Sequence, residues 1–218
     1  MATTEPNGPI RLLLIGATGA VGSQVLNFAL ADPRISQVVT LTRKAQAPQT
    51  KLENHVVDFS SLPDDAPWWQ VDAVICTLGT TIKAAGSQAA FAAVDRDLPI
   101  RVATLARKAG ATRYALNSSL GANPDGNFYL STKAQAEAGI RALAFPNYTI
   151  VRPSLIDTVR TESRPGELIG IYVARAMRWL IPKHYRPVRP GQIAQALLEG
   201  VLREQFGEHI IESEQLQF

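Results

Sequence analysis

The sequence predicts an α/β fold, a doubly wound parallel sheet of Rossmann type with the strand order 3-2-1-4-5-6 and a small C-terminal helical lid. Short runs rich in Val and Ile alternate with longer segments of helical periodicity, which is typical of a parallel sheet buried between helices. A glycine-rich turn follows the first apolar run, as in dinucleotide-binding folds. We expect a disordered stretch at 1–9, a single domain over 10–218, and a lid or substrate region over 154–190.

The apolar runs and helical patterns place the individual elements along the chain. Strands are expected near Ile10–Ile15, Gln37–Thr42, His55–Asp58, Val71–Thr77, Arg113–Ser118 and Tyr148–Arg152. Helices are expected near Ala20–Ala31, Asp97–Ala109, Phe128–Leu143, Glu167–Leu180 and Gly191–Arg203. Asp97 can cap the helix whose first turn holds Pro99, and Gly110 can end the same helix.

Composition argues against several classes of function. The net charge is +3, and Lys and Arg are scattered rather than clustered, so we expect no nucleic-acid partner. The single cysteine, Cys76, permits no disulfide within the chain, and its place inside an expected strand favours a core role. The N-terminus lacks a signal-peptide pattern, and no apolar stretch approaches the roughly 20 residues that span a bilayer. These features predict a cytoplasmic protein.

Three glycines, Gly16, Gly19 and Gly22, lie between the first strand and the first helix in the stretch GATGAVG. The N-terminus of a helix offers unpaired N–H groups and a partial positive charge to an anion. In this pattern Gly16 permits a tight turn, Gly19 admits a pyrophosphate to the backbone, and Gly22 lets the helix pack closely on the strand. The spacing therefore predicts a dinucleotide site, and the alternative is three structural glycines at a helix entry.

The residues after the second strand favour NADP over NAD. An NAD site usually places Asp or Glu about 20 residues past the glycines, where it binds the ribose 2′-OH. This chain has Thr42, Arg43 and Lys44 there, and a guanidinium pairs with a 2′-phosphate that a carboxylate would repel. The alternative is two solvated basic residues in a loop. Asp58, at the end of the third strand, is placed to meet the edge of the adenine ring.

A tyrosine and a lysine in the stretch YLSTK indicate proton transfer. Tyr129 and Lys133 are four residues apart, so they share one face of a helix. The ammonium favours the phenolate and can bind the nicotinamide ribose, while the phenol donates its proton to a carbonyl oxygen that receives hydride. In the stretch NSS, at the end of the preceding strand, Ser119 could polarise that carbonyl, and Ser118 faces the cofactor or packs. The alternative is a helical ion-pair face beside a serine-rich turn.

The remaining polar and aromatic residues suggest no second site. His55, His184 and His209 lack the spacing of metal ligands, so no metal is expected. The acidic triplet at 95–97 is interpreted as a helix entry rather than an acid pair. The neighbouring tryptophans at 68–69 could form a contact surface, although covering the sheet edge is the simpler role.

The glycine turn, the serine after the fifth strand and the YxxxK spacing, in this order, resemble the short-chain dehydrogenase/reductases. Further stretches narrow the resemblance to an atypical branch that includes the Tat-interactive oxidoreductase-like proteins and bacterial proteins named as NAD(P)-binding or epimerase-like. They are CTLGTTIKAAG (Cys76–Gly86), FAAVDRD (Phe91–Asp97), NSSLGA (Asn117–Ala122) and SRPGE (Ser163–Glu167). The likeness covers about residues 10–205.

The resemblance implies a Rossmann fold with bound NADP(H), a catalytic pair of Tyr129 and Lys133 and, as in some members, action through a protein partner. The expected cofactor contacts are Gly16, Thr18, Gly19, Ala20, Val21 and Gly22 at the pyrophosphate, Arg43 at the 2′-phosphate, Leu78 and Gly79 on the ribose side, and Pro153 after the sixth strand.

The leading hypothesis is an NADP(H)-dependent oxidoreductase that acts on a small carbonyl or alcohol through Ser119, Tyr129 and Lys133. A non-catalytic NADP(H)-binding sensor that engages a protein partner is the second hypothesis, and a nucleotide-sugar epimerase is the third. The intact catalytic residues favour an enzyme. Only about 65 residues follow the RPS at Arg152–Ser154, which leaves little room for the substrate domain of an epimerase. The sequence leaves open whether the protein is a monomer or a homodimer.

Overall fold

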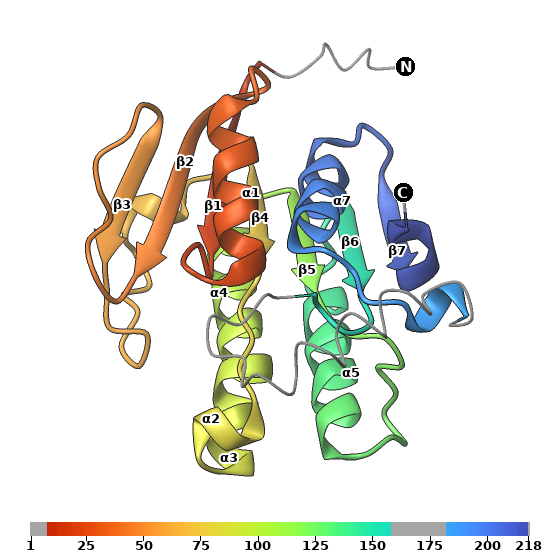
Figure 1. The fold of residues 1–218 in the computed structure, drawn as a ribbon. Coiled ribbons are helices and arrows are strands. Elements are labelled where there is room, and N and C mark those ends of the chain that lie inside the picture. The colour runs from red at the N-terminus through yellow and green to blue at the C-terminus, as the bar shows by residue number, and fades with distance from the viewer. Residues whose placement is uncertain (1–7, 158–181, 218) are drawn as a thin grey trace, which may run out of the picture.

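The computed structural model describes residues 8–157 and 182–217. In this part of the chain, seven parallel strands form one sheet in the order β3-β2-β1-β4-β5-β6-β7, with helices on both faces (Figure 1). The predicted Rossmann-type fold and strand order are confirmed, and β7 adds a strand at the edge beside β6. The helix expected near Glu167–Leu180, most of the lid region and most of the N-terminal stretch at 1–9 lie outside the described residues.

The described elements follow the predicted rhythm of strands and helices. The strands are β1 (Ile10–Ile15), β2 (Ile35–Thr42), β3 (Leu52–Val56), β4 (Ala73–Cys76), β5 (Arg113–Asn117), β6 (Asn147–Arg152) and β7 (Gly207–Glu212). The α-helices are α1 (Ala20–Ala31), α2 (Ile82–Ala85), α3 (Gln88–Ala92), α4 (Leu98–Lys108), α5 (Phe128–Arg141) and α7 (Pro190–Leu202). Among the described residues, none of these helices combines the length and apolar character that crossing a membrane requires.

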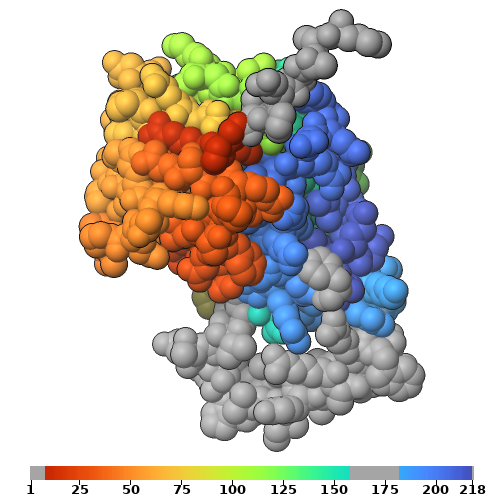
Figure 2. Space-filling view, turned by 90° about the horizontal axis from the view of Figure 1, so that it is seen from above, coloured from red at the N-terminus to blue at the C-terminus, as the bar shows by residue number. Residues whose placement is uncertain are grey.

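Two apolar cores lie on opposite faces of the sheet. Leu12 and Leu14 of β1 belong to the core beneath α1 and α7, whereas Leu13 and Ile15 belong to the core beneath α4 and α5. Figure 2 shows the surface of α1, in orange, against that of α7, in blue, on the first face. Because each central strand is buried on both faces, most successive residues are apolar, and this explains the nearly continuous apolar runs in the sequence.

The edge strand β3 begins earlier than predicted, at Leu52 instead of His55. The prediction followed the apolar residues after His55, but the strand itself is polar and its side chains are satisfied by β1 and β2. The amide of Asn54 donates to the hydroxyls of Thr40 and Thr42, at 2.9 and 2.8 Å. An edge strand with one neighbour and a solvated side does not need an apolar run.

The tryptophan pair covers this edge of the sheet, as the simpler interpretation predicted. Trp69 is buried, and its indole N–H donates to the carbonyl of Pro63 at 2.8 Å. The ring of Trp68 lies 4.7 Å from the imidazole of His55 on β3, centroid to centroid. Trp68 therefore covers the sheet at β3, while Trp69 belongs to the core that contains Leu41 of β2.

The start of α4 differs from the prediction. Asp97 makes no capping hydrogen bond, because the chain is already helical there and forms a π-helical turn over Ala93–Asp97. Pro99 has no N–H to donate to the carbonyl of Asp95. The N–H of Leu98 donates to the carbonyl of Ala93, five residues earlier, which is the hydrogen-bond spacing of a π-helix. The end of α4 is as predicted, since Gly110 adopts a left-handed φ of 112° just beyond it.

Candidate cofactor and active site

The glycine turn has the tight geometry that its spacing predicts. Gly16 adopts a φ of +87°, which glycine tolerates without strain. A Cβ at Gly22 would lie 2.0 Å from the carbonyl oxygen of Gly16 and 2.7 Å from the hydroxyl of Thr77, so α1 contacts the strand end too closely for any side chain. At Gly19 the nearest atom to an added Cβ is the Gly16 oxygen at 3.4 Å, and the other side is open.

The first turn of α1 is uncapped by any side chain. Gly19 occupies the N-cap position and has no side chain with which to accept the N–H groups of the first turn, Ala20–Gly22. These donors lie at the carboxyl end of β1, where the order of the strands in the sheet reverses between β1 and β4. An anion can bind at such a helix end.

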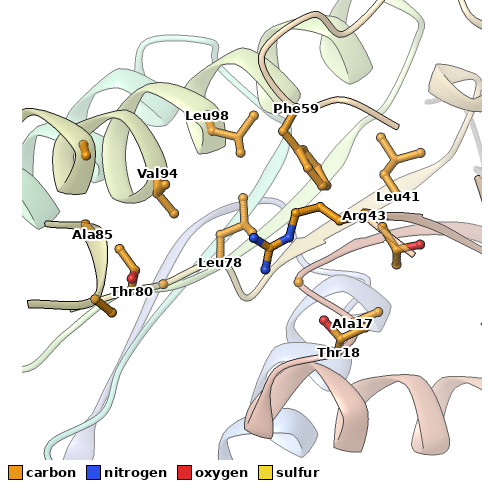
Figure 3. Close-up of a pocket in the computed structure, with 15 residues that line it drawn as sticks. Ala17, Thr18, Leu41, Arg43, Phe59, Leu78, Thr80, Ala85, Val94 and Leu98 are labelled. Atoms are coloured by element: carbon orange, nitrogen blue, oxygen red, sulfur yellow. The ribbon is translucent and has the colours of Figure 1, made fainter. Parts of the chain in front are cut away.

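A cavity of about 420 Å³ lies beside this turn, at the carboxyl ends of β1, β2 and β4 (Figure 3). Figure 3 shows the guanidinium of Arg43 pointing into the cavity, near Leu78 and the ring of Phe59. The lining residues are Gly16, Ala17, Thr18, Leu41, Thr42, Arg43, Phe59, Leu78, Gly79, Thr80, Ala84, Ala85, Ala90, Val94 and Leu98. The cavity is therefore mostly apolar with one cation, and no carboxylate belongs to its described lining.

Eight of the residues predicted to contact the cofactor lie outside this lining, namely Gly19, Ala20, Val21, Gly22, Lys44, Asp58, Ser118 and Pro153. The first four form the adjoining helix entry, whereas Lys44 and Asp58 lie on the surface. Lys44 is exposed, and its backbone carbonyl accepts a 2.7 Å hydrogen bond from the hydroxyl of Thr42. Asp58 is exposed as well, and its carboxylate accepts hydrogen bonds from the amide and hydroxyl of Ser60, which lower its pKa. The adjacent Phe59 contributes the lining side chain instead. Sequence reasoning missed it because a single aromatic residue after a strand is no motif.

Tyr129 and Lys133 share one face of α5, as their spacing predicts. Asn127 caps the start of the helix, and its side chain accepts the N–H of Leu130. The Tyr129 ring lies 5.6 Å from the ring of Phe91, and the Lys133 nitrogen lies 6.0 Å from the centre of the Tyr129 ring. The phenol and the ammonium are therefore neighbours, and their shared role in proton transfer stays a prediction.

The π-helical turn places Asp95 against Lys133. The two side chains form an ion pair of 2.7 Å, and both are buried. The other carboxylate oxygen of Asp95 accepts the backbone N–H of Thr80 at 2.9 Å, which ties the pair to the loop after β4. The interpretation of the triplet at 95–97 as a helix entry is wrong, because the chain is already helical from Gln88 onward. Pro99, four residues after Asp95, was the sequence signal for an irregular helical turn here, because proline has no N–H to donate to the Asp95 carbonyl.

The two serine hydroxyls in the turn after β5 have different hydrogen-bond partners. Ser118 is buried, and its hydroxyl donates to the carboxylate of Glu137 at 2.5 Å, so of its two predicted roles the geometry supports packing. Ser119 is half-buried, and its hydroxyl makes one long contact, 3.4 Å to the carbonyl of Leu120. The N–H of Leu120 donates to the carbonyl of Pro153 at 2.8 Å, so Pro153 supports the turn through its backbone.

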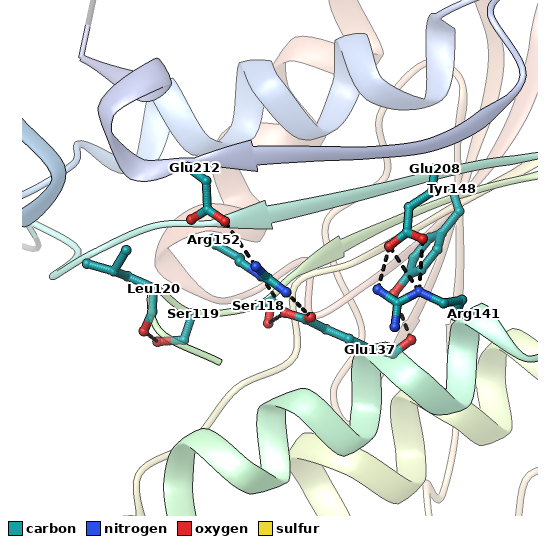
Figure 4. Close-up of polar contacts among 9 residues, drawn as sticks. All are labelled: Ser118, Ser119, Leu120, Glu137, Arg141, Tyr148, Arg152, Glu208 and Glu212. Atoms are coloured by element: carbon teal, nitrogen blue, oxygen red, sulfur yellow. Dashed lines mark hydrogen bonds and ion pairs between the residues drawn. The ribbon is translucent and has the colours of Figure 1, made fainter. Parts of the chain in front are cut away.

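A network of charges missed by sequence reasoning lies behind this turn (Figure 4). Arg152 of β6 donates to both oxygens of Glu137, from Nε at 3.0 Å and Nη2 at 2.6 Å, and to Glu212 of β7 at 3.0 Å. Hydrogen bonding to Glu137 raises the pKa of Arg152 above its ordinary value. The partners come from α5, β6 and β7, and no spacing within the sequence reveals such a meeting.

In the ranges 8–157 and 182–217, no three His, Cys, Asp or Glu side chains gather as metal ligands. Each histidine has a different local partner: His55 pairs with Glu53, His184 stacks on Tyr185, and His209 meets a backbone carbonyl. Cys76 is buried, and burial raises the pKa of its thiol. The core role predicted for the cysteine agrees with this placement.

The sheet order, the glycine turn and the adjoining cavity define a dinucleotide-binding α/β protein of the Rossmann class. The NAD(P)H-binding family model matches residues 16–168, and the chain belongs to that family. It is 38% identical to the mitochondrial protein fmp52 of Emericella nidulans over 173 residues, which cover 75% of this chain and 74% of the relative. It is 35% identical to HTATIP2 of Rattus norvegicus over 165 residues, which cover 73% and 68%. The predicted resemblance is confirmed.

Solved structures share the fold at low identity. MoeE5 in complex with UDP-glucose and NAD superposes with a TM-score of 0.69 and 15% identity, covering 94% of this chain and 79% of that one. A putative NAD-dependent epimerase/dehydratase from Bacillus halodurans gives a TM-score of 0.64 and 18% identity, with coverage of 94% and 97%. These structures agree with the fold, and the family supports a nicotinamide cofactor. The cytoplasmic location stays a prediction, since the name of the fmp52 relative places that protein in mitochondria.

Proposed function

We propose that the protein is an NADP(H)-dependent oxidoreductase that interconverts a small carbonyl compound and its alcohol. The observation that carries this proposal is the buried ion pair of Lys133 and Asp95 beside the phenol of Tyr129. A lysine that served only to hold the fold would not need a tyrosine one turn away and a serine turn at the same sheet edge. A pure cofactor sensor would have no use for the tyrosine.

The residues present fit a phosphorylated dinucleotide. The uncapped first turn of α1 and the open side of Gly19 would hold the pyrophosphate. The apolar lining suits a base, and Arg43 would pair with a 2′-phosphate. Because the described lining contains no carboxylate to bind a ribose 2′-OH, we expect NADP to bind more tightly than NAD.

Proton transfer and the polarisation of the carbonyl are assigned to side chains of this protein. The bound nicotinamide supplies or accepts the hydride. In reduction the Tyr129 hydroxyl gives its proton to the carbonyl oxygen, and in oxidation the phenolate takes the proton back. Ser119 donates a hydrogen bond to the same oxygen, since its hydroxyl has only one long contact in the described structure. Lys133 stabilises the phenolate, and Asp95 fixes the position of Lys133.

Calorimetry with NADPH and NADH tests the first half of the proposal. NADPH should bind the wild-type protein more tightly. Arg43→Ala should weaken NADPH by roughly 1.5–3 kcal/mol, the cost of losing one charged hydrogen-bonding partner, and should leave NADH nearly unaffected. Lys44→Ala is the matched control, because Lys44 is the adjacent cation but lies outside the described lining. Equal affinities for the two cofactors in the wild type would contradict the preference for NADP.

A screen of small aldehydes and ketones for NADPH oxidation tests the second half. We expect turnover of at least one class of carbonyl compound. NADPH binding without turnover, accompanied by altered association with another protein, would favour the sensor hypothesis instead. Failure to bind either cofactor would overturn both.

A further inference from the structure

Glu137 is a buried carboxylate to which the proposed reaction assigns no role. It is 2% exposed and lies four residues after Lys133 and eight after Tyr129, so all three side chains project from one face of α5. Its two oxygens accept three hydrogen bonds, one from the hydroxyl of Ser118 and two from the guanidinium of Arg152 (Figure 4). A single side chain of the helix thus contacts the ends of both β5 and β6.

Both partners of Glu137 lead directly to the serine turn. Ser118 immediately precedes Ser119, and its own N–H donates to the carbonyl of Val151 on β6 at 2.8 Å. Arg152 immediately precedes Pro153, whose carbonyl accepts the N–H of Leu120. The turn is therefore fixed on one side by hydrogen bonds to the backbone at the end of β6. On the other side it is fixed by the hydrogen bond from the Ser118 side chain to Glu137 of α5. Glu137 joins these two attachments.

Burying a charged pair is an inefficient way to attach a helix to a sheet. Desolvation offsets much of the Coulombic gain, and apolar residues of similar volume often stabilise a fold equally well. The helix already has the buried Ile140 and an exposed ion pair between Arg141 and Glu208 of β7. What the pair of Glu137 and Arg152 adds is a directional contact that only one relative placement of helix and turn satisfies.

We propose that Glu137 and Arg152 form a positioning pair, which fixes the turn bearing Ser119 relative to the face of α5 bearing Tyr129 and Lys133. The pair acts through Ser118 and touches neither substrate nor cofactor. Its relevance to catalysis rests on the proposed function, but the order that it imposes on the turn can be measured without any substrate.

Hydrogen–deuterium exchange of the full chain, without added cofactor, tests the proposal. Ser118→Ala removes the hydroxyl that links the turn to the helix. The double variant Glu137→Leu/Arg152→Met removes the ion pair and preserves an apolar contact, so the fold should persist. In both variants we expect the amides of Leu120 and Ala122, which are bonded to Pro153 and Ser119, to exchange roughly tenfold faster.

Glu208→Gln is the matched control, because it breaks a separate ion pair, the one between Arg141 of α5 and Glu208 of β7, and leaves the serine turn intact. It should leave the exchange of the turn at the wild-type rate. A purely structural pair would instead give faster exchange along α5 and an unchanged turn in the two test variants, and that result overturns the proposal.

The proposed function is judged separately, by binding of NADPH to the wild-type protein. If NADPH fails to bind but the turn loosens as expected, the positioning pair stands and the oxidoreductase proposal falls. Where a substrate is found, Ser118→Ala should lower kcat and leave the KM for NADPH unchanged. A lower affinity for NADPH with an unchanged kcat would contradict a positioning role.

Discussion

The two halves of the sheet treat polar groups in opposite ways. Around β1, α1 and β2, the glycine turn leaves backbone donors uncapped, and Arg43 points into a cavity (Figure 3). Around β5, α5 and β6, the charges are paired within the protein: buried Lys133 with buried Asp95, and buried Glu137 with half-buried Arg152. The first half offers donors and a cation to an anionic ligand, whereas in the second half these charged side chains are paired with one another.

This difference predicts how the two halves respond to substitution. In the first half, substitutions at the open positions Gly19 and Arg43 should change ligand binding and leave the fold nearly intact, because few protein contacts depend on them. In the second half, removing one charge leaves its buried partner uncompensated, so stability and turnover should change together. The predictions below test that division, beginning with the largest expected effect.

Gly19→Val should abolish cofactor binding in a folded protein. Gly19 has a φ of −78°, which valine accepts, but the new side chain would fill the open side of the turn. The variant should keep its circular dichroism spectrum and lose the rise in melting temperature that NADPH produces. Gly22→Ala is the counterpart, since its Cβ would collide with the Gly16 carbonyl and reduce stability itself. Retained stabilisation of Gly19→Val by NADPH would place the phosphates elsewhere.

Tyr129→Phe should lower turnover by roughly 10²–10⁴-fold, the usual contribution of a positioned general acid. The ring contact with Phe91 survives the loss of one oxygen, so NADPH affinity and melting temperature should stay close to wild type. Tyr114→Phe removes the same atom from the core, where the hydroxyl bonds the carbonyl of Pro99, and it controls for indirect effects. Steady-state kinetics on a substrate from the screen provide the measurement. A wild-type rate for Tyr129→Phe would exclude it as proton donor.

The contrast between the halves also explains what the sequence could predict. The glycine turn is a local device: three residues with fixed spacing determine its conformation, so its geometry follows from the sequence. The central strands were predictable for a similar reason, since burial on both faces demands apolar runs. Strand β7 was not, because its residues, GEHIIE, lie at a solvated edge and carry no such run.

The half around β5, α5 and β6 depends on contacts that no local pattern encodes. The shared face of Tyr129 and Lys133 follows from helical spacing. Asp95, however, lies 38 positions before Lys133 and belongs to the π-helical turn over Ala93–Asp97. Short helices were missed although their capping residues, Thr81 and Ser87, were visible in the sequence. Four or five helical residues are too few to show a periodicity.

Asp95→Asn should destabilise the protein by about 3–5 kcal/mol, because it leaves the buried Lys133 ammonium without a counter-charge. Asparagine can still accept the N–H of Thr80, so the loss reflects charge rather than loop order. Asp97→Asn, two residues on and more than half exposed, should cost less than about 1 kcal/mol. Urea unfolding measures both. The double variant Asp95→Asn/Lys133→Met should recover much of the stability, and a lack of recovery would argue against the pair as the cause.

The smallest effect concerns the exposed ion pair at the far end of α5. Hydrogen bonding to Arg141 lowers the pKa of Glu208 below its ordinary value of 4.5. The folded protein therefore binds this proton more weakly than the unfolded chain, so the contribution is present above pH 4.5 and is lost as pH falls through the lower folded value. Because the two side chains are 45% and 33% exposed, we expect only about 0.5 kcal/mol. Urea unfolding should show wild type more stable than Glu208→Gln by this amount at neutral pH, with the gap closing in acid. A gap that persists at low pH would assign the difference to packing, and a gap as large as that of Asp95→Asn would break the division between paired buried charges and exposed ones.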